Sequence, residues 1–222
     1  MDHSDTIRQL IISVPALVFA ITFHEVSHGY IANRLGDPTA KLMGRLTLNP
    51  IKHIDPVGTV LMPILLYWIS DGRFIFGYAK PVPINPHNFQ NPKSGMAISA
   101  AAGPISNIIL AIISSLLRVV IIFLISNFSQ NSLITSTLIP LVLMLEYSIY
   151  INIFLAALNL TPILPLDGGR VLVGLLPHKQ AMAYSKIEPY GIYILYALYF
   201  TGIIGLFIFP LVNLLYLLVP FI

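Results

Sequence analysis

Long apolar runs separated by short polar connections dominate the chain. The runs 7–34, 94–127 and 132–161 each exceed the roughly 20 residues that a helix needs to cross a bilayer core. A further apolar run, 190–222, is interrupted by Pro210, and the part after this proline is too short to cross. The pattern predicts an all-α polytopic membrane protein, a helical bundle of about four to six membrane segments.

The connections between these runs are rich in glycine and proline. Residues 35–55 combine Gly and Pro with a short alternation of polar and apolar positions, which predicts turns with small strands. In 77–86 the alternating prolines prevent a helix and favour an extended chain. We therefore expect a small extended or β membrane-associated loop region beside the bundle.

Composition supports the membrane assignment. Only 9% of the 222 residues are charged and 56% are hydrophobic, whereas a soluble domain carries roughly 25% charged residues. The net charge of +3 would suggest nucleic acid in a soluble protein, but basic residues in short loops set membrane orientation, so no nucleic-acid partner is expected. The absence of cysteine excludes disulfides, thiolate catalysis and cysteine-ligated zinc. Residues 1–222 are expected to form a single membrane-embedded domain.

The distribution of basic residues predicts the orientation of the chain. Lysine and arginine gather in three connections and are missing from a fourth: they occur in 34–55, 71–93 and 170–186, and not in 127–132. The positive-inside rule places the first three in the cytoplasm and the fourth outside. The short apolar segment 56–70 then begins and ends on one side, so we expect it to re-enter the membrane; the alternative is a thin, tilted span.

The first apolar run carries a metal-binding motif. His24-Glu25-Val26-Ser27-His28 places two imidazoles one helical turn apart on one face, with Glu25 beside them. The alternative is a pair of histidines hydrogen-bonded within the bundle. Ionisable groups at membrane depth are costly and point to function, so the motif predicts a metal centre with His24 and His28 as ligands.

A third protein ligand is needed, and Asp167 is the best candidate. Pro162 and Pro165 unwind the chain before Asp167, and irregular backbone at membrane depth occurs where it lines a cavity. With the predicted orientation, Asp167 lies at the inner end of 132–161, at the depth of the two histidines. Glu146 lies nearer the middle or the outer half of the span and is a rival, and Asp55 is excluded less firmly, because its loop could fold back.

Three motifs in this order resemble the site-2 protease family of intramembrane zinc metalloproteases. They are His24–His28, Gly103-Pro104-Ile105-Ser106-Asn107, and Asn159 through Leu166-Asp167-Gly168-Gly169. The resemblance implies zinc bound by His24, His28 and Asp167, Glu25 as the catalytic carboxylate, and substrate support by Asn159 and Asn107. The stretch 77–83 resembles the family's small members without PDZ or CBS domains. The resemblance also implies an outside N-terminus and a prokaryotic plasma membrane.

The expected function is hydrolysis of peptide bonds in or near the transmembrane helices of single-span membrane proteins. Zinc would activate a water, and Glu25 would accept and return its proton. The extended segment 77–86, or a short strand within 40–50, could pair with an unwound substrate backbone. The rival functions are a transporter or metal-binding membrane protein, which should have symmetric halves that the sequence lacks, and a catalytically silent relative, against which the intact Glu25 argues.

Smaller features complete the predictions. Arg118 lies within the run 94–127 and is expected to pair with Glu146 or to snorkel. His53, His87 and His178 fall in predicted loops and are expected to be solvated rather than to bind the metal.

Overall fold

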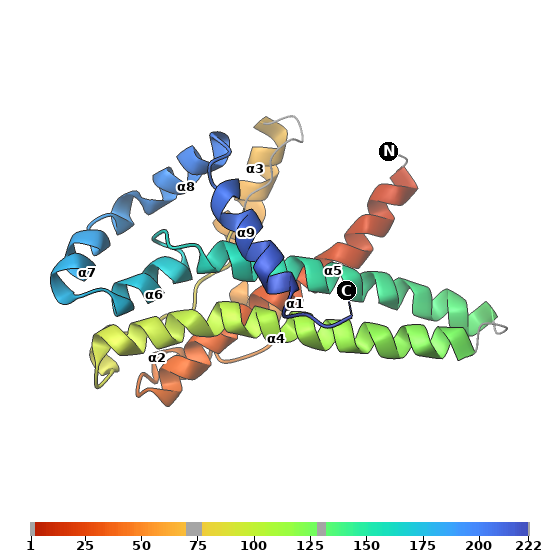
Figure 1. Cartoon of the computed structure of the whole chain (residues 1–222), viewed down its shortest axis with the longest axis horizontal. Helices are drawn as coiled ribbons and strands as arrows, with labels where there is room; N and C mark the ends of the chain where they lie inside the picture. The colour runs from red at the N-terminus through yellow and green to blue at the C-terminus, as the bar shows by residue number, and fades with distance from the viewer. Residues whose placement is uncertain (1–2, 70–76, 128–131, 222) are drawn as a thin grey trace.

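Three long helices form the frame of the molecule. The computed structural model describes residues 3–69, 77–127 and 132–221. The long helices are α1 (His3–Arg34), α4 (Pro92–Asn127) and α5 (Ser132–Leu160). In Figure 1, α4 and α5 lie side by side while α1 crosses them at an angle. All three are long and apolar enough to cross a membrane, so the predicted all-α membrane fold is confirmed.

The C-terminal quarter is a series of shorter helices. They are α6 (Asp167–Leu175), α7 (His178–Ser185), the 3-10 turn η4 (Glu188–Tyr190), α8 (Gly191–Phe200) and α9 (Gly205–Tyr216). The stretch from α7 through α8 bends by 85° into α9, and the pair together would supply a fourth span. The run 190–222 is therefore a broken segment whose last helix packs on the bundle (Figure 1).

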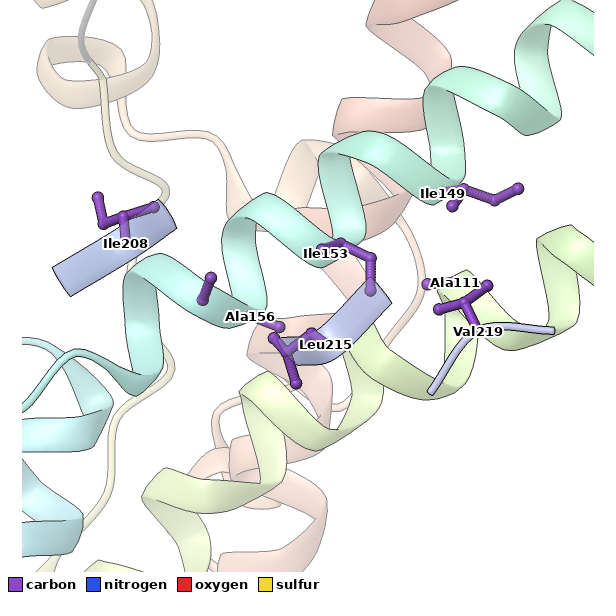
Figure 2. Close-up of a cluster of buried hydrophobic side chains, with 8 residues drawn as sticks. Ala111, Ile149, Ile153, Ala156, Ile208, Leu215 and Val219 are labelled. Carbon is purple, nitrogen blue, oxygen red and sulfur yellow. The ribbon is translucent and has the colours of Figure 1, made fainter. Parts of the chain in front are cut away.

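The apolar core lies where α9 crosses α4 and α5. Figure 2 shows this cluster of buried side chains, contributed by Ala111 of α4, Ile149, Ile153, Ala156 and Ala157 of α5, Ile208 and Leu215 of α9, and the following Val219. Elsewhere α4 leaves about half of the surface of Ile109, Ile113 and Val120 uncovered. Such apolar exposure along a spanning helix suits a surface that faces lipid.

The prediction of small strands in 35–55 is wrong. This connection contains α2 (Thr39–Leu42) and the 3-10 turn η1 (Pro50–His53), and no strand forms in 3–69, 77–127 or 132–221. The reason is that its amides bond locally: Asn49, for example, accepts from the Ile51 amide. The short strand within 40–50 that was expected to pair with the substrate backbone is therefore also absent.

Residues 77–85 are extended, as predicted, but do not build a ladder. Among the described residues, two isolated backbone–backbone bonds tie them to the preceding chain, from Tyr78 N to Gly58 O (3.0 Å) and from Lys80 N to His53 O (2.9 Å). Pro81 and Pro83 lack the amide hydrogens that would continue the pairing. The region thus runs beside the helices without pairing as a strand, with the Val82 and Asn85 amides bonded to side chains of Glu25 and Asp37, and it ends at the 3-10 turn η3 (Pro86–Asn88).

The segment proposed to re-enter the membrane is helical and short. The π-turn η2 (Pro56–Leu61) continues into α3 (Met62–Ile69), and together they rise about 21 Å at 1.5 Å per residue, less than a bilayer core of about 30 Å. Re-entry remains a prediction. Of the connections that set the orientation, 70–76 and 128–131 lie outside the described residues.

The minor predictions have mixed outcomes. Arg118 does pair with Glu146, at 2.9 Å. His87 and His178 are exposed, but His53 is buried, with Nε2 2.9 Å from the Thr47 carbonyl, so the expectation of a solvated His53 is wrong. The extended chain at Lys80 covers it, a contact between segments far apart in sequence.

A buried carboxylate ties the end of α1 to the extended region. Asp37 is fully buried, and its two oxygens accept hydrogen bonds from the Thr39 amide (3.1 Å), the Asn88 Nδ2 (2.7 Å) and the Asn85 amide (2.7 Å). Burial alone would raise the pKa of Asp37, but these hydrogen bonds outweigh it and hold the pKa below its usual value. The ionised form is therefore the one that the fold stabilises.

Replacing Asp37 with asparagine is expected to lower the free energy of unfolding by about 1–3 kcal/mol at pH 7, because an amide donor then faces other donors. The wild-type contribution should be complete above the unfolded-state pKa of about 3.9 and disappear as pH falls through the lower folded-state pKa. In thermal unfolding of the metal-free protein in detergent, the difference in unfolding temperature between wild type and Asp37→Asn should be constant from pH 6 to 8. This difference in unfolding temperature should become smaller below about pH 4. A difference in unfolding temperature that does not change with pH would contradict the conclusion that the fold stabilises the ionised form of Asp37.

Candidate metal centre

Three of the predicted residues meet at one point. His24 and His28 lie one turn apart on α1, and their Nε2 atoms are 3.0 Å from each other. Asp167, the first residue of α6, places its Oδ2 3.1 Å from the His24 Nε2 and 3.3 Å from the His28 Nε2. All three side chains are buried. Among the described residues they form the one group with the spacing to hold a metal ion.

The second ring nitrogens show where the imidazole protons lie. The His28 Nδ1 is 2.7 Å from the Ser99 carbonyl oxygen, which can only accept, so this nitrogen carries the hydrogen. The His24 Nδ1 is 2.7 Å from the Asn107 Oδ1, which likewise accepts. In the neutral form of each ring, Nε2 is then unprotonated and directs its lone pair at the other two atoms of the cluster.

The orientation of the Asn107 amide is fixed by its other partners. Its Nδ2 donates to the Ala20 carbonyl (3.2 Å) and to the Asn152 Oδ1 (2.8 Å), and Asn152 in turn donates to the Ser148 carbonyl (2.8 Å). Asn107 is completely buried. This chain of bonds turns the Asn107 Oδ1 toward His24, so the tautomer follows from the packing of α1, α4 and α5.

The cluster fits a divalent cation. Two imidazole nitrogens and one carboxylate oxygen face one another, and within the described part of the chain the Asp167 Oδ2 accepts no hydrogen bond. Electron pairs this close repel unless a cation lies between them. Two histidines and one carboxylate, with a fourth position left for water, are a donor set of catalytic zinc.

Two glycines place Asp167. A Cβ on Gly168 would lie 2.3 Å from the Leu160 carbonyl oxygen, and one on Gly169 would lie 2.6 Å from the Leu164 nitrogen. Only glycine lets the first turn of α6 pack directly on the unwound chain that follows α5. The Asp-Gly-Gly sequence is therefore a packing requirement that brings the carboxylate back to α1.

A glycine on α4 makes room for the two imidazoles. A Cβ on Gly103 would lie 2.4 Å from the His28 Nε2 and 2.6 Å from the His24 Cε1. Small residues let helices approach closely, and here the approach puts the backbone of α4 against the two imidazoles. The flanking Ala102 and Pro104 are also buried in this contact.

Gly103→Ala is expected to weaken zinc binding at least about tenfold, because the added methyl displaces one or both rings from the hydrogen bonds that orient them. Competition with a chelating dye on the purified protein would measure the affinity. Ile105→Ala, on the exposed side of the same helix, is the control and should bind zinc as the wild type does. Equal affinity in Gly103→Ala and wild type would contradict the placement of Gly103.

Glu25 lies in the same cavity as the three clustered residues. A cavity of about 340 Å³ is lined by His24, His28, Asp167 and Glu25, with Asn159 on its wall. The Val82 amide, from the extended segment, donates to the Glu25 Oε2 at 2.8 Å. Glu25 Oε1 makes no hydrogen bond to the described residues. One oxygen of the carboxylate is thus held in place while the other remains available for a proton.

Comparison with known proteins gives the family. The family model "Peptidase family M50" matches residues 125–202. The Bacillus subtilis (strain 168) protein "Putative zinc metalloprotease YwhC" is 34% identical over 200 residues, 90% of this chain and 85% of the relative. The chain belongs to peptidase family M50. The resemblance to site-2 proteases is thereby confirmed, and the chain is a multi-pass membrane zinc metalloprotease.

A second bacterial relative shares part of this M50 chain. The Mycolicibacterium smegmatis protein "Putative zinc metalloprotease Rip2" is 29% identical over 116 residues, half of this chain and 43% of the relative. No solved structure matches the chain.

The remaining predicted site residues have distinct positions in the M50 fold. Asn159 lines the cavity, and its Nδ2 donates to the Leu155 carbonyl of its own helix at 3.0 Å. Asn107 lies behind His24 rather than on the cavity wall. The two rival acids are engaged elsewhere: Glu146 pairs with Arg118, and Asp55 accepts from the amides that open η2.

Sequence reasoning missed three residues that support this M50 site. Asn152 could have been found, because it is a strongly polar residue in an apolar run, seven residues before Asn159. Ser99 and Val82 contribute a backbone carbonyl and a backbone amide. Groups that every residue carries give no signal in the sequence, so only the fold identifies these two.

Proposed function

We propose that this M50 protein is an intramembrane endopeptidase that hydrolyses peptide bonds in or near the transmembrane helix of single-span membrane proteins. The observation that carries the proposal is the convergence of the two Nε2 atoms and the Asp167 Oδ2, with Glu25 on the same cavity. The cavity lies among spanning helices, so a substrate that reaches it is itself embedded in the bilayer. We further propose that 1–222 acts as one membrane-embedded domain in a prokaryotic plasma membrane.

His24, His28 and Asp167 would hold zinc, and Asn107 and Ser99 would orient the two imidazoles. When bound, zinc would lower the pKa of a water to about 7 and polarise the scissile carbonyl. Holding both Nδ1 hydrogens in fixed bonds keeps the rings in the tautomer that binds metal and raises their basicity. Asn107 is thus a positioning residue in this proposal.

Glu25 would act as general base and then general acid. Its Oε1 accepts the proton of the attacking water and later returns it to the leaving amine, while the Val82 amide holds Oε2. Asn159 would use its amide to bind the substrate carbonyl that gains negative charge. Because the Asn159 Nδ2 already donates to Leu155, this role uses its second amide hydrogen.

The extended edge at 77–85 would receive the substrate backbone. A helix has its amides bonded internally and resists hydrolysis until it unwinds, and an extended neighbour stabilises the unwound form by main-chain hydrogen bonds. The segment lies on the cavity wall through Tyr78, Ala79 and Val82. If a flexible linker in place of Lys80–Ile84 left cleavage of a helical substrate unchanged, this docking mode would be wrong.

Cleavage of a single-span substrate in reconstituted vesicles tests the proposed function. The purified protein should cut the substrate, lose this activity after treatment with a zinc chelator, and regain it when zinc is added back. Zinc bound at full stoichiometry with no cleavage of several single-span substrates would favour a metal-binding membrane protein or a catalytically silent relative instead.

A further inference from the structure

A second, larger cavity adjoins the catalytic one. It has a volume of about 790 Å³, within the range of ligand sites, and lies between the extended segment, the start of α4, and helices α6 and α7. The two cavities meet at shared lining residues, which are Pro81, Val82, Ile84, Met96 and Arg170. The two cavities therefore share a wall, and a chain bound beside Glu25 lies next to the larger cavity.

The larger cavity is basic at its edge and apolar within. Lys93, Arg170 and Lys186 contribute three positive charges against the single negative charge of Glu188. Arg170 pairs with Glu188 at 3.4 Å, and Lys93 donates to the Leu176 carbonyl. Lys186 is exposed and has no partner among the residues that the structure describes. Leu164, Val173 and Met182 supply apolar wall between these charges.

We propose that this cavity binds an acidic juxtamembrane segment of the substrate, the stretch that flanks the cleaved helix on the basic side of the membrane. The inference rests on the proposed function and names the substrate class. Charge complementarity favours acidic residues on the bound segment. The shared wall with the catalytic cavity favours a peptide over a lipid headgroup, because a peptide is long enough to contact that wall from both cavities.

Such a site would also select among membrane proteins. The cytoplasmic flanks of transmembrane helices usually carry lysine and arginine. The connections that form this cavity are predicted to lie on that same side, so a typical basic flank would meet like charges there. Repulsion of the wrong partner is an effective source of specificity. The basic edge thus admits the minority of single-span proteins whose flank is acidic.

Two substrates that share one helix and one scissile sequence test this proposal. One carries a Glu- and Asp-rich flank and the other a Lys-rich flank, and both are cleaved in phosphatidylcholine vesicles. The acidic substrate should have a kcat/KM about tenfold higher. Lys186→Glu should lower the value for the acidic substrate about fivefold and raise it for the basic one. Lys179→Glu, on α7, the helix that ends just before Lys186, but not among the residues that line the cavity, is the matched control and should change neither.

Binding to the Glu25→Gln variant separates this inference from the proposed function. Fluorescence anisotropy of the acidic flank peptide should detect binding that weakens with Lys186→Glu in that background, even if no substrate is cleaved. Equal cleavage of the two substrates, or equal effects of Lys186→Glu and Lys179→Glu, would overturn the acidic-segment site while leaving the protease intact. An effect of Lys186→Glu that appears only in vesicles with anionic lipid would overturn it in favour of a headgroup site.

Discussion

Glu25→Gln is expected to lower kcat for substrate cleavage by about 10²–10⁴-fold while zinc remains bound at wild-type stoichiometry. Glutamine keeps the size of the side chain and can still accept the Val82 hydrogen bond, but an amide cannot take a proton from water. Because the change leaves His24, His28 and Asp167 intact, the variant should still bind zinc although it cleaves substrate far more slowly. Cleavage rates and zinc content of the same purified sample would measure both.

Glu146→Gln provides the matched control for this prediction. Glu146 is also a glutamate within a spanning helix, but it pairs with Arg118 away from the cluster. The control should cleave at the wild-type rate. Wild-type activity in Glu25→Gln would remove Glu25 from the mechanism, and loss of zinc in that variant would mean that Glu25 is a ligand.

Asp167→Asn is expected to abolish activity through loss of the metal. The change removes the one negative charge that faces the two Nε2 atoms and puts an amide group where the cation needs a carboxylate. The affinity for zinc should fall by more than the roughly 10–100-fold that loss of an outer-shell partner costs. Zinc titration with a chelating dye would measure this fall, and added zinc should restore part of the cleavage.

Asp55→Asn is the control for Asp167→Asn. Asp55 undergoes the same chemical change, yet its Oδ1 caps the amides of Val57 and Gly58, and asparagine retains that acceptor. Zinc affinity and cleavage should therefore stay at wild-type levels. An Asp167→Asn variant that holds zinc as tightly as Asp55→Asn would show that the third ligand lies elsewhere.

The parts of the fold and site that the sequence predicts are those set by local geometry. Helical spacing alone places His24 and His28 on one face, and the length of the apolar runs alone requires α1, α4 and α5 to span. The prediction for Asp167 used depth in the membrane, which follows from counting residues. In the structure the carboxylate lies beside the two rings.

The features that the sequence did not predict depend on contacts between distant segments. The strands expected in 35–55 did not form, because side chains and nearby carbonyls satisfy those amides locally. His53 is buried because the chain near Lys80 lies over it. Asn107 was predicted to support the substrate, and its position behind His24 follows from how α4 packs on α1. None of these contacts leaves a periodic pattern along the chain.

Glycines pack against the residues of the candidate metal centre, so the packing of the helices sets the geometry of the site. The missing side chain at Gly103 leaves room for the imidazole rings of His24 and His28, and the one at Gly168 leaves room for the turn that carries Asp167. Each glycine is required by what lies opposite it in space. Motifs that look like separate signatures in the sequence are therefore the facing surfaces of one packed site.

Zinc K-edge X-ray absorption on the purified protein, with metal content measured on the same sample, tests the central claim most directly. The account predicts one zinc per chain, with two imidazole nitrogens and oxygen ligands at about 2.0–2.2 Å. It also predicts that Asp167→Asn reduces the bound metal and Asp55→Asn does not. A purified, folded protein that binds no zinc, or whose zinc shows no imidazole ligands, would contradict the account.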